Sequence, residues 1–495
     1  MNINKMTSEI NPLSAKITKL FKNSLVYGLT SSLQSVLGFV LLPILTIYYT
    51  PEIFGVYSIL LLLSALTSSI FYLGASSALG RFYYEEDSDL YKRKVFTTAL
   101  IVTLIGAFLL ISCGLIFAKP LSVSLFETGK YYLPIILILI ATSFGFLLNL
   151  MTLLLRYENK AGLFFKIIIS GVLVNFIVTY SLLSKFNFGI LAPIYGILIS
   201  NSLSFLILVL IKFKDLTKKL EMNHFKLIIS FGIKSSFAGL SFYLLDWIDR
   251  LIINELLDLN DVGLYSLGYR LGAIINILII VPFSFVWGPA RMQYAKSKML
   301  PFFTTKVVSY YTLIGVFILS ATILFGEDIL KIFFINKSYA DAMLIVPIIM
   351  FSLLFYGYGN IIDFGIYINN KIHYYPIIAI FLILFNVTFN FWLIPVFGYQ
   401  AAAYVTLITY FLSSSIVFFI SNFHYFIKIE TTRVFSALII IPILYYLVNF
   451  STALNLSIRI IIALIILFMF YTLWLNQKER AYIIYGIKKL VNIKK

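Results

Sequence analysis

Three charged side chains interrupt an apolar stretch in the middle of the chain. Residues 242–257 read FYLLDWIDRLIINELL and carry Asp246, Asp249 and Arg250. A charge at bilayer depth costs about 2.5–3.5 kcal/mol on insertion scales, so such residues usually serve a pathway or a partner. On a helix, both acids share one side with Lys234, and Asp246 and Arg250 have the i,i+4 spacing of an ion pair. The stretch is therefore either one wall of a polar cavity or a self-neutralised structural pair.

Other charges lie alone in or beside apolar stretches. Lys234 and Arg270 have no acidic residue within helical reach, so each either binds an anionic group, extends to the membrane surface or pairs across helices. Asp363 is an isolated acid that either titrates with a coupling ion or is a solvated helix-end group. Arg81 has Glu85 four residues on, which favours an anchor at the membrane surface over contact with a ligand.

The elements that position these residues are membrane-spanning helices. Of 495 residues, 61% are hydrophobic and 12% charged, and the mean hydropathy is +0.97. Soluble domains have about 25% charged residues, so the chain is an integral membrane protein. A helix needs about 20 apolar residues to cross a bilayer. This length predicts fourteen spans, near 24–48, 55–79, 95–117, 131–154, 163–183, 190–211, 227–256, 262–288, 303–325, 341–366, 374–395, 399–422, 434–450 and 456–475.

The basic residues recur in short clusters between these spans. The net charge is +17 with 38 Lys and Arg, but no single basic arm forms, which argues against a nucleic-acid partner. Most of these residues fall in alternate loops and at both ends of the chain, so the positive-inside rule places both termini in the cytoplasm. Residues 1–22 are polar and are not expected to be a cleaved signal. The tail at 476–495 is expected along the inner leaflet.

Cysteine and histidine offer no further chemistry. Cys113 is the one cysteine, so no disulfide can form within the chain. The three histidines, His224, His373 and His424, are too widely spread to propose a metal site. No phosphate-binding GxxxxGK[ST] loop occurs, so hydrolysis of ATP by this chain is not expected.

The two halves of the sequence share a pattern. TPEIFGVYSI matches LNDVGLYSLG with Gly55 and Gly263 208 positions apart, as are Tyr57 and Tyr265. Six spans plus six, followed by two, explain this offset, and equivalent helices then run in the same direction. Such halves can rock about a central cavity, which favours an alternating-access transporter. Further pairs with similar offsets are Asn159 and Asn370, Asn175 and Asn386, and Gly189 and Gly398.

The repeat gives the expected domain organisation. The segments are a cytoplasmic N-terminus (1–22), an N-lobe (23–211), a cytoplasmic linker (212–226), a C-lobe (227–422), two extra spans (434–475) and a basic cytoplasmic tail (476–495).

Four stretches match a known family in their order and spacing. They are LLPILTIYYTPEIFGVYSI, RFYYE at 81–85, LLDWIDRLIINELLDLNDVGLYSLGYRL and NVTFNFWLIPVFGYQAAAYVTLITYF. From about residue 20 to 475 the chain thereby resembles the bacterial polysaccharide-transporter family, the O-antigen and capsular repeat-unit flippases. That family belongs to the MOP superfamily, with the MATE drug exporters and the lipid II flippases.

The resemblance implies a fold and a function. The fold is an all-α polytopic membrane protein, with two six-helix lobes around a cationic cavity and two C-terminal helices bordering a groove for a lipid tail. The function is to move undecaprenyl-diphosphate-linked oligosaccharide, destined for O-antigen of lipopolysaccharide, capsule or a related polysaccharide, to the outer leaflet of the bacterial inner membrane. Expected partners are this substrate, membrane lipids, a polysaccharide polymerase and a chain-length regulator.

The same resemblance suggests roles for the charges. Diphosphate binding in a cationic cavity is expected of Lys234, Arg270 and Arg250, with Arg81 as a further candidate. The acids Asp246, Asp249 and Asp363 are candidates for the cavity wall or for ion coupling. No cofactor is expected, and H⁺, Na⁺ and the membrane potential all stay open as the driving force.

Two other functions compete with this interpretation. A MATE-like cation or drug antiporter shares the architecture, but it favours a cavity dominated by acids, whereas the cations here favour an anionic cargo. A membrane polysaccharide polymerase or ligase usually needs a sizeable external loop with catalytic groups. The longest outside connections here are on the order of 15 residues, so an enzyme is not expected.

Overall fold

The computed structural model describes residues 3–217, 222–284, 287, 291, 300–333, 336–369, 371, 373–450, 455–477 and 479–481. Within these ranges, the side chains at 3–25, 222–223, 237–246, 329–330, 332–333 and 450 fall outside the description. The described residues form helices and connecting turns and contain no strand. Thirteen helices there are long and apolar enough to cross a membrane, against fourteen predicted. The predicted span near 227–256 is also one continuous helix, α8 (Met222–Leu256). The expected all-α polytopic fold is confirmed.

The helices pack into two compact units. Unit 1 comprises Met1–Ser266 and Ala379–Ala402, and unit 2 comprises Leu267–Ile378 and Ala403–Lys495. Unit 1 contains α1 (Ile3–Tyr48), α2 (Pro51–Phe71), α3 (Ala75–Phe82), α4 (Asp89–Phe126), η1 (Gly129–Tyr131), α5 (Tyr132–Tyr157), α6 (Ala161–Ser184), α7 (Leu191–Lys212), η2 (Phe213–Asp215), α8, the first part of α9 (Leu259–Gly272) and most of α14 (Tyr374–Phe397). Here α5 packs against α2, α4 and α7, and α6 packs against α1 and α7.

Unit 2 is built around one long helix, α11 (Leu300–Phe333), which packs against α12, α16, α17 and α18. Its other elements are the end of α9, the π-helical turn η3 (Asn276–Ile280), η4 (Lys337–Ile345), α12 (Val346–Ile362), α13 (Phe364–Ile368), most of α15 (Gln400–His424), α16 (Thr431–Leu438), α17 (Ile440–Phe450), α18 (Leu456–Met469) and η5 (Phe470–Trp474). These units are defined by packing, so the lobes and linker derived from the repeat stay a prediction.

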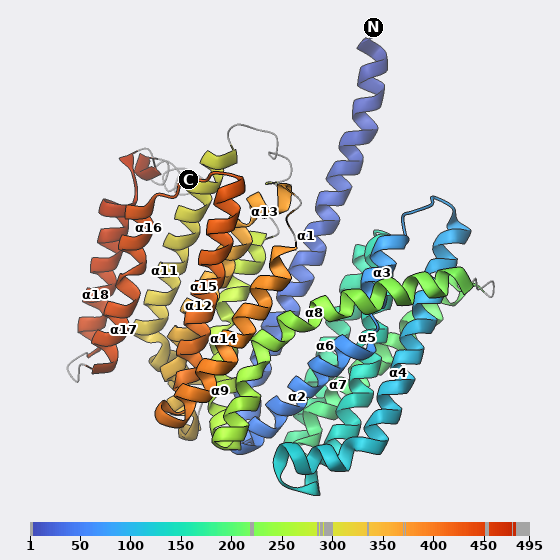
Figure 1. Cartoon of the computed structure of the whole chain (residues 1–495), viewed down its shortest axis with the longest axis horizontal. Coiled ribbons are helices and arrows are strands. Elements are labelled where there is room, and N and C mark those ends of the chain that lie inside the picture. Colours follow the sequence, from blue (N-terminus) through green and yellow to red (C-terminus); the bar gives the residue numbers. More distant parts are fainter. Residues whose placement is uncertain are drawn as a thin grey trace, which may run out of the picture. The chain divides into compact units, whose positions relative to one another are not determined.

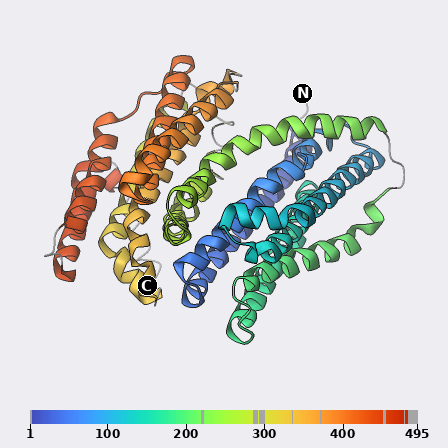
Figure 2. The same ribbon diagram turned by 60° about the horizontal axis from the view of Figure 1, so that its bottom comes forward.

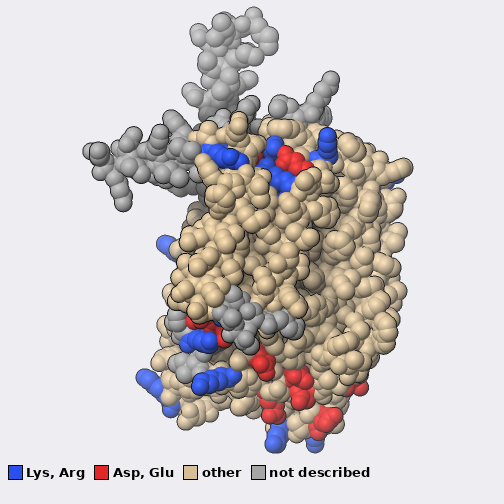
Figure 3. Space-filling model, turned by 90° about the vertical axis from the view of Figure 1, so that its left-hand side faces the viewer, with Lys and Arg blue, Asp and Glu red and all other residues tan. Residues whose placement is uncertain are grey.

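Apolar side chains cover the outside of the helices. Phe108 is 70% exposed and Phe419 is 71% exposed, each in a helix long enough to span. On the face shown in Figure 3, the acidic and basic side chains gather toward two opposite ends, and a broad, largely uncharged band lies between them. Such a surface is stable in the hydrocarbon core of a membrane, because apolar side chains exposed there are not in contact with water.

The second predicted span, near 55–79, is broken in the structure. Leu73 and Gly74 have φ angles of 53° and 60°, which end α2 and start α3 in a new direction. A β carbon on Gly74 would lie 2.0 Å from the carbonyl oxygen of Gly232, and one on Gly232 would lie 2.2 Å from that of Leu73. The two glycines therefore let α8 cross directly over the break. Figures 1 and 2 show α8 running across α2 and α3, against which it packs.

A second close crossing joins the two halves of the predicted repeat. A β carbon on Gly55 in α2 would lie 2.0 Å from the carbonyl oxygen of Leu259, and one on Gly263 in α9 would lie 1.8 Å from that of Pro51. Both pairs of equivalent residues are 208 positions apart, so the contact is reciprocal. A local two-fold relation between α2 and α9 gives this reciprocity, and only glycine fits on either side.

Candidate functional site

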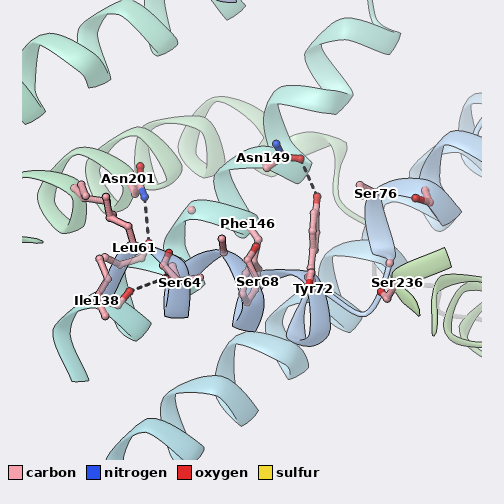
Figure 4. A pocket seen from close by; sticks show the side chains of 18 of the residues that line it. Leu61, Ser64, Ser68, Tyr72, Ser76, Ile138, Phe146, Asn149, Asn201 and Ser236 are labelled. Atoms are coloured by element: carbon pink, nitrogen blue, oxygen red, sulfur yellow. Dashed lines mark hydrogen bonds between the residues drawn. The ribbon is translucent and has the colours of Figure 1, made fainter. Parts of the chain in front are cut away.

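Five helices of unit 1 line a partly open cavity of about 580 Å³ with many polar side chains. Its walls come from α2, α3, α5, α7 and α8, and it lies beside the break between α2 and α3 (Figure 4). The volume falls in the range of about 300–1,000 Å³ that is typical of small-molecule sites. None of its described lining residues is charged. The hydrogen-bonding ones are Ser64, Ser68, Ser69, Tyr72, Ser76, Ser77, Thr142, Asn149, Asn201, Ser235 and Ser236.

Hydrogen bonds between helices fix part of this lining. The Ser64 and Thr142 hydroxyls lie 2.6 Å apart and join α2 to α5. The Asn201 amide donates to the carbonyl oxygen of Ala141 at 3.1 Å, which joins α7 to α5. The Tyr72 hydroxyl donates to Asn149 Oδ1 at 3.2 Å across the cavity (Figure 4). Such bonds between membrane helices hold the walls at fixed positions.

A second site in unit 1 surrounds Asp249, which is fully buried in α8. The Tyr265 hydroxyl of α9 donates to Asp249 Oδ2 at 2.6 Å. The Asn390 amide of α14 donates to Asp249 Oδ1 at 2.7 Å and to Asn386 Oδ1 at 3.0 Å. The buried Asn390 Oδ1 accepts no hydrogen bond from the described residues. We call these four residues the Asp249 cluster.

Arg250, next to Asp249 in the sequence, is 2% exposed. Its guanidinium lies 4.4 Å from the Trp247 ring centroid and 5.6 Å from that of Tyr265. A guanidinium held over two rings is stabilised by cation–π attraction. Whether this stretch is a cavity wall or an ion pair of Arg250 with Asp246 stays a prediction. Asp246 lies in α8, but its side chain falls outside the described residues.

The other predicted cations lie on α3, α8 and α9. Lys234 is exposed on α8 and Arg81 is exposed on α3, where its guanidinium lies 6.0 Å from the Phe82 ring. Arg270 is half-buried in α9, in the part that belongs to unit 2. None of the three is among the described residues that line the cavity. Their role in binding a diphosphate stays a prediction.

The expectation that Asp363 is an isolated acid is wrong. In unit 2, Arg291 donates to Asp363 Oδ1 at 2.5 Å, and the Tyr375 hydroxyl donates to Asp363 Oδ2 at 2.8 Å. Arg291 also donates to the carbonyl oxygen of Asn360 at 3.2 Å. Neither partner lies within one helical turn of Asp363, so the spacing of residues along one span could not predict these contacts. Whether the carboxylate takes part in coupling stays a prediction.

Two ionic networks at helix ends were not predicted from the sequence. In unit 1, buried Lys212 forms ion pairs with Glu158 and, at 2.7 Å, with Asp215. In unit 2, Glu430 binds Lys306 at 2.5 Å, and Arg433 binds Glu430 and Glu479 at 3.1 and 2.9 Å. The signal in both cases is an acid in a short loop that is otherwise basic, where topology alone predicts only cations.

Comparisons with known proteins agree with this architecture. The family described as "Polysaccharide biosynthesis protein" matches residues 20–295. Protein 1 of the Lsg locus of Haemophilus influenzae is 24% identical over 267 residues, which cover 53% of this chain and 63% of the relative. The match thus spans less than two thirds of that relative's length.

Three solved structures share the fold. A lipid II flippase, MurJ, in an inward closed conformation has a TM-score of 0.73 at 17% identity, covering 90% of this chain and 98% of that one. An inward-facing multidrug-resistance MATE transporter has a TM-score of 0.61 at 16% identity, covering 82% and 93%. A MOP-superfamily transporter from Pyrococcus furiosus, described as having a binding pocket of reversed polarity, has a TM-score of 0.61 at 16% identity, covering 82% and 95%.

Proposed function

Because this chain belongs to the polysaccharide biosynthesis protein family, we propose that it is a flippase. It moves lipid-linked oligosaccharide units, destined for O-antigen, capsule or a related surface polysaccharide, to the outer leaflet of the bacterial inner membrane. The observation that carries this proposal is the cavity of about 580 Å³, which is lined by hydroxyl and amide groups. Three of its five helices, α2, α5 and α7, are apolar and long enough to cross a membrane. A cavity with polar walls among such helices suits a polar cargo that the hydrocarbon core excludes.

The physical problem is that the two ends of the cargo need different environments. A glycan loses its hydrogen bonds with water when it enters hydrocarbon, whereas a polyprenyl tail is stable there. A cavity in a helical bundle accepts the glycan while the tail stays in lipid. The MATE-like fold, with members solved in more than one conformation, supports access to the cavity from each side in turn. The family and fold are those of transporters, which supports transport over polymerase or ligase chemistry.

The anionic diphosphate of the cargo needs cationic groups. We assign this role to Lys234 and Arg270, with Arg81 as a further contact. The exposed Lys234 side chain on α8 supports this, because α8 also contributes Ser235 and Ser236 to the cavity wall. Arg250 was a third candidate, and its burial between rings makes it the weakest.

The driving force is proposed to act through the Asp249 cluster. This cluster combines a buried carboxylate with phenol and amide groups and an Asn390 oxygen that accepts no hydrogen bond from the described residues. Oxygen groups of this kind suit a proton or a hard cation such as Na⁺. Asp246 and Asp363 stay as alternatives, and Asp363 is the less suitable because Arg291 binds it.

The remaining proposals concern the setting of the protein. Both termini lie in the cytoplasm, as the basic loops predict. The substrate comes from enzymes that build the lipid-linked unit inside the cell, and a polymerase with a chain-length regulator uses it outside. A MATE-like drug antiporter is the second candidate because it shares the fold. The uncharged cavity argues against it, since a cationic drug favours acidic walls.

Reconstituted liposomes test the proposal. Purified protein is inserted into vesicles that carry lipid-linked oligosaccharide in both leaflets, and a membrane-impermeant glycosidase is added outside. A flippase lets the enzyme digest nearly all of the glycan, whereas protein-free vesicles protect about half. Substitution of Lys234→Ala or Arg270→Ala should slow digestion without loss of folded protein. Full activity in both variants contradicts their diphosphate role, and protection equal to empty vesicles contradicts the flippase.

A further inference from the structure

The cavity in unit 1 is polar and uncharged at the same time. Membrane helices usually satisfy serine hydroxyls on their own backbone, as Ser69 does with the carbonyl oxygen of Leu66 at 2.8 Å. Ser68, Ser77 and Ser235 form no hydrogen bond with the described residues, although they line the cavity. The buried Ser236 hydroxyl also lacks a partner there. These hydroxyls are available to a molecule inside the cavity.

One wall of the cavity is aromatic. The Tyr72 and Phe146 rings are stacked, with centroids 5.5 Å apart and planes 17° apart. Tyr72 is held in this position by its hydrogen bond to Asn149. A flat aromatic face packs well against the C–H face of a sugar ring, and the surrounding hydroxyl and amide groups match the donors and acceptors on its edge.

The absence of charge among the described lining residues selects the kind of ligand. An anion brought into such a site exchanges water for neutral dipoles alone, which is unfavourable without a cation. A neutral sugar needs only hydrogen bonds and apolar contact. The site therefore suits uncharged polyols better than diphosphates or acidic sugars.

We propose that this cavity binds the uncharged sugar rings of the cargo, while the diphosphate is held by cations elsewhere. This inference rests on the proposed function and adds that the cavity selects uncharged sugars and that the diphosphate binds outside it. It also gives an order of preference: a repeat unit with neutral sugars near the lipid binds better than one with uronic acids there.

The serines without a hydrogen-bond partner are separate from the groups that join the helices. Ser64 with Thr142, and Asn201 with Ala141, hold the walls together, so their substitution would damage the fold. Ser68 and Ser235 have no such partner and are the groups to change. Ser202 on α7 is a matched control, because it is half-buried, bonds to its own helix at Leu198 and does not line the cavity.

Cysteine protection tests the proposal directly. The chain has one cysteine, so Cys113→Ser gives a background free of thiols, into which Ser68→Cys or the control Ser202→Cys is placed. The full-length protein in nanodiscs is labelled with N-ethylmaleimide alone, with polyprenyl diphosphate, or with the same lipid bearing its oligosaccharide. We expect the sugar-bearing lipid at saturation to slow labelling of Ser68→Cys about tenfold, because the ligand fills the cavity. Bare lipid should leave the rate unchanged, and the control should respond to neither.

Removal of hydroxyls gives an independent measurement. The double variant Ser68→Ala with Ser235→Ala should raise the Kd for the sugar-bearing lipid about tenfold, because two hydrogen bonds are lost. Its Kd for bare polyprenyl diphosphate should not change, and Ser202→Ala should change neither constant.

Two results would overturn the inference. One is equal protection of Ser68→Cys by the bare lipid, which places the diphosphate or the tail in the cavity. The other is no protection by the sugar-bearing lipid in a preparation that moves this lipid across liposomes. A preparation that shows protection but no movement keeps the site and rejects the proposed flippase, so the two failures can be told apart.

Discussion

Two regions of unit 1 occupy equivalent places in the sequence repeat and differ in charge. In the first half, the equivalent positions, taken together as the first region, are Leu41 in α1, Tyr57 in α2, and Asn175 and Thr179 in α6. Leu41 is 9% exposed and Tyr57 is 4% exposed. The Thr179 hydroxyl donates to Asn175 Oδ1 at 3.2 Å. Every side chain in this region is neutral.

In the second half, the same offsets of 208 and 211 positions lead to the four residues of the Asp249 cluster. Both halves have a tyrosine and an asparagine at two of the equivalent positions. In the second half, Asn390 stands where the first half has threonine, and Asp249 stands where it has leucine. Burial of a carboxylate is costly unless it is paired and hydrogen-bonded. The first region shows that a leucine can fill the equivalent place on a long membrane helix. The acid is therefore not required to build this kind of packing, which supports a role in transport.

The largest expected effect comes from making the second region neutral like the first. Asp249→Asn keeps the shape and most hydrogen bonds but removes the charge, so coupling to an ion should be lost. Liposome transport should fall about 100-fold, which is near the upper end of typical coupling between sites. The exposed loop substitution Asp87→Asn is the matched control. Transport by Asp249→Asn at the rate of the unchanged protein would end the coupling role of the cluster.

The reciprocal glycine crossing gives the next effect, on stability. Gly55→Ala and Gly263→Ala each force a β carbon into a backbone oxygen at 2.0 and 1.8 Å. Overpacking of this kind costs roughly 1–3 kcal/mol, and the local two-fold relation predicts similar losses. Gly38→Ala is the control, because a β carbon there meets no atom within 4 Å. Thermal unfolding measures all three, and a large loss at only one side of the crossing would contradict the reciprocity.

A smaller effect separates the two equivalent positions Asn390 and Thr179, which are both fully buried. Asn390→Leu removes the donor to Asp249, so transport should fall about tenfold if that hydrogen bond to a charged group contributes a typical 1.5 kcal/mol. Thr179→Val removes a bond between two neutral groups in the first region, and transport should change little. Equal effects of the two substitutions would mean that both regions serve only packing.

The smallest effect concerns the ends of the helices. Among the described residues, the start of α4 has two long ion pairs, Lys92 with Asp87 at 3.4 Å and Arg93 with Asp215 at 4.0 Å. In contrast, α11 starts in the network around Glu430. Burial acts to raise the pKa of Glu430, but hydrogen bonds from Lys306, Ser309 and Arg433 lower it below its ordinary value. The pKa of Glu479 is lowered in the same way, against the effect of burial, by the Asn476 backbone, Tyr310 and Arg433.

A carboxyl with a lowered pKa stabilises the fold above its unfolded pKa of about 4.3, and this contribution is lost as the pH falls through the folded value. We therefore expect the Tm to decrease between about pH 5 and pH 3, with a shallower decrease in the double variant Glu430→Gln, Glu479→Gln. Because both carboxyl groups are partly exposed, their contribution to the free energy of unfolding should be about 1 kcal/mol or less. Identical pH profiles for both proteins would show that this network does not contribute.

The features that depend on composition and periodicity could be predicted from the sequence. Apolar length located the spans, and constant offsets revealed the repeat whose reciprocal contact appears at Gly55 and Gly263. Features that depend on contacts between distant segments could not be predicted in this way. The Asp249 bond to Asn390 joins residues 141 apart, and the Asp363 pair with Arg291 joins residues 72 apart.

The break between α2 and α3 was also hidden. Leu73 adopts a positive φ of 53° within an apolar run, where a leucine gives no turn signal. The cavity beside this break consists of serines and asparagines whose spacing is ordinary for packed membrane helices. Its uncharged lining emerges only when five helices are brought together, so it could not be predicted from the sequence.

The most direct test of the central claim is the sidedness of the lipid-linked oligosaccharide in cells depleted of this protein. A lectin or glycosidase that reaches only the outer face of the inner membrane reports where the units are. The flippase account predicts that intact units accumulate and stay inaccessible. Single units that accumulate on the outer face would contradict it, because translocation would then be intact and the defect would lie in polymerisation or transfer.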